Sequence, residues 1–441
     1  MKRVLILGAG LVSRPLVRYL LNLPDVETTV ATRTVKKAQE LIENSPRGRA
    51  VELLVDDEPS LHRLVKGSDV VVSLLPYVYH TVVAKHCLAL KKHLVTTSYV
   101  SDGMRALDDE AKRANLIFLN EIGLDPGIDH MSAMAIIDRV RANNGRIVSF
   151  ISSCGGLPAP EANNNPWGYK FSWSPKGVLM ATRNNALFLK DGKEVMVPAS
   201  RLFASFWRVK IEDAGEFEAY PNRNSLPYIG LYGLEGVRTM IRATLRNLGW
   251  CETMQAIVDL GVLQEEGIRN DIMSMTYSQW LKGFVPGSGD LRALVARRLN
   301  LSLDHPVIER FAWLGLFDDS PIGLESGSNL DILAKAMLAK MGYQPGERDM
   351  IVLHHQFEIE YPDRKREKVE STLIDYGEPD GDSAMARTVS LPAAIAVKMI
   401  LEGKLRLSGV QIPVKKEIYQ PVLEELKKLG IEFKERSEFI V

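Results

Sequence analysis

The chain has 441 residues, of which 46% are hydrophobic and 25% charged, and its formal net charge is zero. This composition is typical of a globular protein and excludes a chain that is disordered, collagen-like or coiled coil throughout. A neutral chain does not bind nucleic acid through its overall charge, and the length suggests two to four domains.

Cysteines and apolar runs bear on the compartment. The three cysteines, Cys87, Cys154 and Cys251, are too few and too scattered for a disulfide framework, which favours a reducing compartment. The apolar run Val4–Val12 contains two glycines and has no signal-peptide cleavage site behind it. No run reaches the roughly 18 apolar residues that span a bilayer. We expect a cytoplasmic protein, or a mitochondrial one.

The first 120 residues alternate short, β-branched apolar runs with segments of helical spacing. This alternation predicts βαβ units and a parallel, doubly wound sheet of the Rossmann type, which binds dinucleotides. The expected strands are Val4–Leu7, Thr28–Ala31, Val51–Val55, Val70–Leu75, Leu94–Thr97 and Ile117–Asn120. The expected helices are Leu11–Leu21, Val35–Asn44, Ser60–Val65, Val78–Leu90 and Gly103–Asn115.

The remainder predicts an α+β domain interrupted by a helical insertion. A helix over Ile128–Val140 leads out of the first domain, and residues 147–246 are turn-rich with strand-like pieces. Residues 251–341 are helical in pattern, and the Gly- and Pro-rich stretch 154–161 is typical of a binding loop. Later strands are expected at Met350–Tyr361 and Lys368–Tyr376, and final helices at Leu391–Leu401 and Glu417–Leu429.

A glycine motif follows the first strand and opens a helix. Gly8 allows a tight turn, and Gly10 lets a pyrophosphate approach the backbone at the helix N-terminus. Ser13 replaces the usual third glycine, and its hydroxyl can reach a phosphate. The order of strand, motif and helix predicts a nucleotide site.

The end of the second strand distinguishes between the two nicotinamide cofactors. NAD-binding folds place an acidic residue there, whereas this chain has Thr32-Arg33-Thr34. A guanidinium between two hydroxyls suits a 2′-phosphate, which a carboxylate would repel. The pattern therefore favours NADP over NAD, with NAD still possible.

Several longer motifs resemble one family. The stretches are GAGLVSRP, SLLPYVYH, VTTSYVS, NEIGLDPGIDH, SCGGLPAPE, NPWGYKFSWSP and YPNRNS. Together they resemble the saccharopine dehydrogenases of the glutamate-forming type, or saccharopine reductases, nearly from end to end. The likeness extends to the dehydrogenase half of the bifunctional aminoadipic semialdehyde synthases. It implies interconversion of saccharopine, NAD(P)⁺ and water with glutamate, aminoadipate semialdehyde and NAD(P)H, in lysine metabolism.

The resemblance also implies a domain plan. The dinucleotide-binding domain would cover residues 1–127, with helices returning at about 390–441. The substrate and dimerisation domain would cover 128–249 and 346–389, with the helical insertion at 250–345. We expect a homodimer that acts on small molecules, with no nucleic acid and no membrane as partners.

The resemblance places the contacts on individual residues. The expected substrate contacts are Ser98, Tyr99, Asp125, Arg223, Thr244, Leu245 and Arg246. The expected cofactor contacts are Gly8, Gly10, Leu11, Val12, Ser13, Thr32, Arg33, Thr34, Val55, Asp56, Leu74, Leu75, Pro76, Gly123, Leu124, Asp125, Ser174, Pro175 and Lys176.

The chemistry of saccharopine suits these residues, because it carries three carboxylates and arginines bind carboxylates bidentately. Candidates for proton transfer to the imine intermediate are Asp125, Tyr99 and Cys154, and Asp125 could instead bind an ammonium group. No metal is expected, since the histidines and cysteines show no zinc-ligand spacing. The alternatives are a carboxynorspermidine-type reductase, whose cationic substrate the arginines disfavour, and a non-enzymatic NADP(H) sensor.

Overall fold

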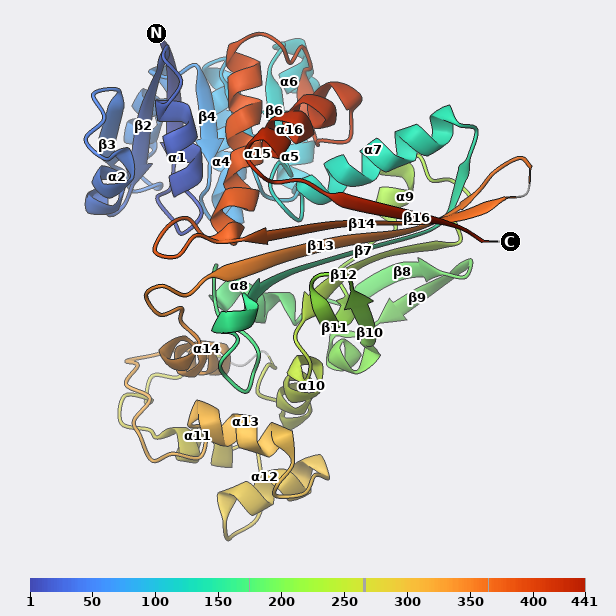
Figure 1. Ribbon diagram of the computed structural model, residues 1–441. Coiled ribbons are helices and arrows are strands. Elements are labelled where there is room, and N and C mark those ends of the chain that lie inside the picture. Colours follow the sequence, from blue (N-terminus) through green and yellow to red (C-terminus); the bar gives the residue numbers. More distant parts are fainter. Residues whose placement is uncertain (174, 265–266, 364, 441) are drawn as a thin grey trace. The chain divides into compact units, whose positions relative to one another are not determined.

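The computed structural model describes residues 1–173, 175–264, 267–363 and 365–440 (Figure 1). The chain forms two compact units. The first consists of Met1–Arg146 and Gly381–Lys434, with a short piece at Tyr361; the second consists of Ile147–Glu360 and Lys365–Asp380, with the chain end from Glu435. The division into three domains stays a prediction.

The first unit contains a parallel seven-stranded sheet of order β15-β6-β5-β4-β1-β2-β3. Its strands are β1 (Lys2–Leu7), β2 (Val26–Thr32), β3 (Gly48–Glu52), β4 (Val70–Ser73), β5 (His93–Thr96), β6 (Ile117–Leu119) and β15 (Gly409–Gln411). The strand order reverses between β1 and β4, and ligands bind at such a reversal in doubly wound sheets. The predicted Rossmann-type fold is confirmed. The seventh strand, β15, was not predicted, because three residues carry no recognisable pattern.

Helices flank this sheet, and α15 runs beside it in Figure 1. They are α1 (Arg14–Leu21), α2 (Val35–Ile42), α3 (Glu58–Lys66), α4 (His80–Ala89), α5 (Asp102–Arg105), α6 (Asp108–Arg113), α7 (Ile128–Ala142), α15 (Ala384–Leu401) and α16 (Lys416–Lys428). The expected single helix Gly103–Asn115 is wrong, since two short helices replace it. The break lies at Leu107, whose side chain is buried in the core between them.

Helix α15 is a segment that is long and apolar enough to cross a membrane by length and composition, although it is not an unbroken apolar run. Its 18 residues meet that test by length and composition, yet 78% of them are buried inside the protein. Arg387, Thr388 and Lys398 interrupt its apolar residues, which is why no unbroken run reveals it. The helix contacts α1, β4 and β5, so it is a core helix of the first unit.

The second unit is built on a mixed sheet of order β10-β11-β12-β7-β13-β14-β16, with β8 and β9 attached through β12. The strands are β7 (Arg146–Pro158), β8 (Ala186–Lys190), β9 (Lys193–Val197), β10 (Trp207–Ile211), β11 (Gly215–Pro221), β12 (Thr239–Arg246), β13 (Asp349–Glu360), β14 (Arg366–Tyr376) and β16 (Lys434–Ile440). Strands β12 and β7 pair in parallel, whereas β10 and β11, β11 and β12, and β13 and β14 pair antiparallel.

The helices of this unit follow the predicted order, with most of them between β12 and β13, so the α+β fold with a helical insertion is confirmed. They are α8 (Pro175–Ala181), α9 (Pro227–Leu231), α10 (Trp250–Leu260), α11 (Tyr277–Lys282), α12 (Leu291–Leu299), α13 (Pro306–Leu314) and α14 (Asn329–Lys340). A hydrophobic cluster that includes Trp250, Trp280 and Phe311 packs α8 and α10 to α14 together.

One prediction for this unit needs correction. Cys154–Pro158 was expected to begin a binding loop, but these residues form the end of strand β7. Gly155 serves packing there: a Cβ on it would lie 2.7 Å from the carbonyl oxygen of Leu245 on the neighbouring strand β12. A glycine-rich stretch thus marks two strands in close approach.

Candidate active site

The glycine motif forms the loop between β1 and α1. Gly8 has a φ of +110°, and a Cβ there would lie 3.0 Å from the carbonyl oxygen of Leu74. Gly10 is exposed, and no atom lies within 4 Å of the position of its missing Cβ. The open space beside this backbone, at the start of a helix, fits the approach of a pyrophosphate.

The side chain of Ser13 forms hydrogen bonds with the backbone of the same loop. Its side chain is buried, and its Oγ accepts a hydrogen bond from the Gly10 amide at 3.0 Å and donates to the Gly8 carbonyl at 3.4 Å. The hydroxyl therefore braces the loop. Its expected contact with a phosphate stays a prediction.

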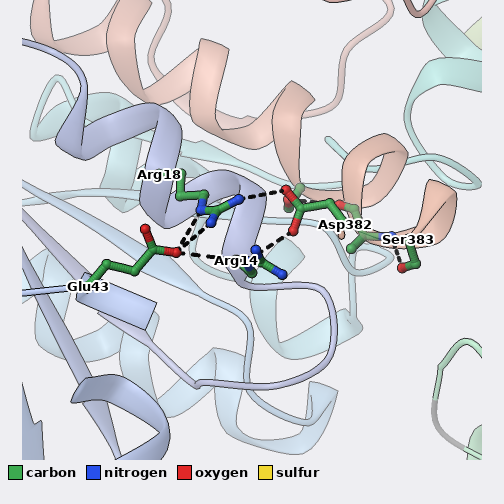
Figure 2. Close-up of polar contacts among 7 residues, drawn as sticks. Arg14, Arg18, Glu43, Asp382 and Ser383 are labelled. Carbon is green, nitrogen blue, oxygen red and sulfur yellow. Dashed lines mark hydrogen bonds and ion pairs between the residues drawn. The ribbon is translucent and has the colours of Figure 1, made fainter. Parts of the chain in front are cut away.

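Arg33 lies directly after β2, and its exposed guanidinium makes no hydrogen bond or ion pair in the described part of the chain. Figure 2 shows two arginines of α1 that do form ion pairs: Arg18 binds Glu43 at 2.6 Å, and Arg14 binds Asp382 at 3.4 Å. Of these three arginines, Arg33 alone forms no ion pair with the described residues. It fits the 2′-phosphate that distinguishes NADP from NAD.

Arg33→Ala is expected to weaken NADP⁺ binding by about 10- to 100-fold, equivalent to ~1.4–2.7 kcal/mol, and to leave NAD⁺ nearly unchanged. Titration of each cofactor measures the two affinities. The control Arg18→Ala removes a charge of the same sign from an existing ion pair and should alter neither affinity. Equal losses for both cofactors in Arg33→Ala would contradict the assignment.

The other expected cofactor contacts are spread over several segments. Leu74, Leu75 and Pro76 follow β4 at the strand-order reversal, and Val55 and Asp56 follow β3. Leu11 and Val12 belong to the glycine loop, Thr32 ends β2, and Thr34 precedes α2 without a side-chain cap hydrogen bond. Gly123 and Leu124 are buried. Pro175 is the first residue of α8, and Lys176 after it forms an ion pair with Asp331 at 2.9 Å. Ser174 lies outside the described residues. All of these contacts stay predictions.

The first unit brings three of the expected substrate contacts together at the carboxyl ends of β5 and β6. The Tyr99 hydroxyl donates to Oδ1 of Asp125 at 3.2 Å, and Ser98 is the residue before Tyr99. Asp125 is the only residue from Leu116 to Met134 that is not buried. Asp125 is therefore the partly exposed residue of an otherwise buried segment.

Buried polar contacts hold this segment. Glu121 accepts a hydrogen bond from the Val100 amide at 3.0 Å through Oε1, and its Oε2 lies 3.0 Å from His130 Nε2. Asp129 lies in the first turn of α7, and its Oδ1 accepts a hydrogen bond from the Gly127 amide at 2.6 Å. Gly127 has a φ of +147°, which an L side chain rarely adopts. These contacts fix the backbone next to Tyr99, at Val100, and the backbone on either side of Asp125, at Glu121 and Gly127.

In the second unit, Arg246 ends β12 and is buried. Its Nη1 donates to the Leu245 carbonyl at 2.8 Å, while its buried Nε has no hydrogen-bond partner. The guanidinium lies 4.9 Å from the ring of Tyr169 and 5.5 Å from that of Trp250. No carboxylate of the described residues pairs with it. A buried cation without a carboxylate is costly, and this one is suited to an anionic ligand.

The titratable groups that interact with Arg246 are two phenols and two thiols, those of Tyr169, Tyr220, Cys154 and Cys251. Burial raises the pKa values of Tyr169 and Tyr220, although the nearby Arg246 opposes the change. Both rings are therefore neutral at ordinary pH. Thr244 pairs with Cys154 across the ladder of β12 and β7, which places an expected substrate contact beside a candidate for proton transfer. The aromatic residues were not predicted, because only the third dimension brings them to the arginine.

Arg223 follows β11, is exposed and has a φ of +55°. Its carbonyl accepts a hydrogen bond from the Leu187 amide at 2.9 Å, which anchors the backbone and leaves the side chain at the surface. Its role as a substrate contact stays a prediction. Among the described residues, no group of three or more His, Cys, Asp or Glu side chains could hold a metal ion.

Comparisons with known proteins cover almost the whole chain. Residues 4–119 match the family model of the saccharopine dehydrogenase NADP binding domain, and 123–431 match the saccharopine dehydrogenase C-terminal domain. Saccharopine dehydrogenase [NADP(+), L-glutamate-forming] of Saccharomyces cerevisiae is 41% identical, with 99% of both chains covered. The mitochondrial alpha-aminoadipic semialdehyde synthase of Bos taurus is 38% identical over 99% of this chain and 48% of its own. The apo yeast saccharopine dehydrogenase (L-Glu forming) structure matches with a TM-score of 0.91 at 40% identity, covering 99% of this chain and all of that one.

Proposed function

The chain belongs to the saccharopine dehydrogenase family, and on that premise we propose how its own residues bind and convert the substrate. The protein is an NADP-dependent oxidoreductase of lysine metabolism. It interconverts saccharopine, NADP⁺ and water with L-glutamate, aminoadipate semialdehyde and NADPH. Neither the carboxynorspermidine reductase nor the sensor alternative is favoured.

One observation carries the assignment of the substrate site: Arg246 is a buried guanidinium with no carboxylate partner in the described chain and an unpaired Nε. Saccharopine brings three carboxylates. We assign one of them to Arg246, with Thr244 and Leu245 of the same strand beside it. The neutral rings of Tyr169 and Trp250 exclude water from the ion pair and so strengthen it.

The cofactor site is assigned to the glycine loop and the residue after β2. The open backbone at Gly10 would receive the pyrophosphate, and Arg33 the 2′-phosphate. When bound, the nicotinamide accepts the hydride from the substrate. The residues of the chain supply binding, orientation and proton transfer around that event.

The substrate carbon that loses the hydride becomes part of an imine. Water adds to this imine, and the C–N bond then breaks, which frees the amine of glutamate and leaves the aldehyde. We assign Asp125 to the substrate ammonium group, since its carboxylate is partly exposed and fixed by the Tyr99 hydroxyl. Tyr99 and Cys154 remain candidates for proton transfer. A covalent role for Cys154 is not needed, because hydride transfer and imine hydrolysis require no nucleophile on the enzyme.

Product analysis tests the direction of cleavage. The protein incubated with saccharopine and NADP⁺ should release glutamate and NADPH in equal amounts. Release of lysine and 2-oxoglutarate would mean that the other carbon attached to the secondary amine is oxidised. That result would contradict the assigned reaction.

Arg223→Ala is expected to raise the Michaelis constant for saccharopine by about 10- to 100-fold, since it removes a charge-assisted contact with a carboxylate. Cofactor affinity should survive. Steady-state kinetics at saturating NADP⁺ measure the change. Unchanged saturation by saccharopine would remove Arg223 from the site.

We also propose that the protein is a homodimer, and that it lies in the cytoplasm or, like the mitochondrial synthases that it resembles, in the mitochondrion. Three cysteines that form no disulfide support a reducing compartment. Sedimentation should give twice the chain mass of 49.2 kDa. A species of single-chain mass would contradict the dimer.

A further inference from the structure

A buried histidine that the reaction does not yet use connects two strands of the first unit at their carboxyl ends. His80 begins α4, and only 4% of it is exposed. Its Nδ1 lies 2.8 Å from Oγ of Ser73, the last residue of β4. Its Nε2 lies 2.8 Å from Oγ of Ser98 and 3.2 Å from Oγ1 of Thr96, which ends β5.

The ring is uncharged at ordinary pH, because burial lowers the pKa of His80 to about 4. A neutral imidazole donates from one nitrogen and accepts at the other. Hydroxyl groups do both, so Ser73 and Ser98 satisfy the ring in either tautomer. The imidazole is therefore held at both nitrogens.

This chain of hydrogen bonds leads from the core toward the surface. Ser73, His80 and Thr96 are buried, whereas Ser98 is only half-buried. Ser98 is thus the member that can meet a ligand, and it precedes Tyr99, which binds Asp125. A brace that served the fold alone would have no need to end on an accessible hydroxyl.

We propose that His80 is a positioning residue that fixes the place of the Ser98 side-chain oxygen, so that this Oγ can contact saccharopine. The inference rests on the proposed function, in which Ser98 contacts the substrate. His80 does not touch the substrate itself, because its ring is buried behind the serine. It acts by preventing the Ser98 side chain from rotating to a conformation that moves its Oγ away.

Two replacements of His80 form a matched pair. A glutamine amide reaches about as far as Nε2 and can keep the bond to Ser98, whereas an asparagine amide lies near Nδ1 and can keep only the bond to Ser73. His80→Asn should raise the Michaelis constant for saccharopine about three- to tenfold, the size of one hydrogen bond. His80→Gln should stay within about twofold of the wild type, and the constant for NADP⁺ should not change in either variant.

The double variant separates positioning from a structural role. In a Ser98→Ala background, His80→Asn should cause no further rise, since the group that it directs is gone. Additive effects, or equal losses in His80→Gln and His80→Asn, would overturn the proposal. Should His80→Asn fail to fold, Ser73→Ala frees the far side of the ring and should raise the same constant about two- to fivefold; no change would overturn the proposal.

Failure of the substrate assignment gives a different result. If Ser98→Ala alone leaves saccharopine kinetics unchanged, Ser98 is not a substrate contact, and both the assignment and the positioning role are wrong. If Ser98→Ala raises the constant while His80→Asn leaves it unchanged, only the positioning role is wrong.

Discussion

Arg246→Met is expected to lower kcat/KM for saccharopine by about 100- to 1,000-fold, equivalent to ~2.7–4.1 kcal/mol. The physical reason is the loss of a paired, charge-assisted contact with a carboxylate in a dry, aromatic site. Methionine fills a similar space without charge, so the strand β12 and the rings around it keep their packing.

The same variant makes a second, opposite prediction for the protein without ligand. Removal of a buried cation that has no carboxylate partner should leave the melting temperature unchanged or raise it. Thermal unfolding without saccharopine measures this change in melting temperature. Thermal unfolding with saccharopine measures the rise in melting temperature that the ligand causes, and this rise should disappear in the variant. The control Arg348→Met breaks an ion pair with Glu161 elsewhere in this unit and should leave kcat/KM within about twofold. Lower stability with normal saturation would make Arg246 a structural residue only.

Asp125→Asn is expected chiefly to raise the Michaelis constant for saccharopine, by about 10- to 150-fold, with a smaller change in turnover. The amide still accepts the hydrogen bond from Tyr99 but lacks the charge that holds an ammonium group. Water reaches an imine that it must hydrolyse and can carry its protons, which leaves the carboxylate for binding. Initial rates over a range of saccharopine concentrations separate the two parameters.

The competing role for Asp125 gives another pattern. If the carboxylate transfers a proton in the rate-limiting step, turnover should fall by ~10²–10⁴-fold and one limb of the pH–rate profile should flatten. That result would contradict the binding role. Turnover and saturation close to wild type would exclude both roles and leave Asp125 as a turn residue before Pro126.

The features that the sequence predicts well depend on local patterns. Gly8, Gly10 and the strand that precedes them have a fixed order that any dinucleotide loop requires, and the alternation of strands and helices predicts the parallel sheet. The three residues of β15 complete that sheet from almost 300 positions further along the chain than β6, and no local pattern reveals such a partner. The glycines after Cys154 mislead because close strand packing and a binding loop need the same residue type.

The candidate site likewise contains residues that a local sequence pattern predicts and residues that no local pattern predicts. Arg33 follows from the position after a strand and the chemistry of a 2′-phosphate. His80 does not, since a lone histidine at the start of a helix has no signature until Ser73 and Ser98 are placed around it. The cage of Tyr169 and Trp250 around Arg246 likewise arises from segments that are distant in the sequence.

The most direct test of the central claim follows the absorbance of the reduced cofactor when the protein is mixed with saccharopine and either NADP⁺ or NAD⁺. The account predicts NADPH formation that depends on saccharopine, with a kcat/KM for NADP⁺ at least about tenfold above that for NAD⁺. No reduction of either cofactor in the presence of saccharopine, or a clear preference for NAD⁺, would contradict it.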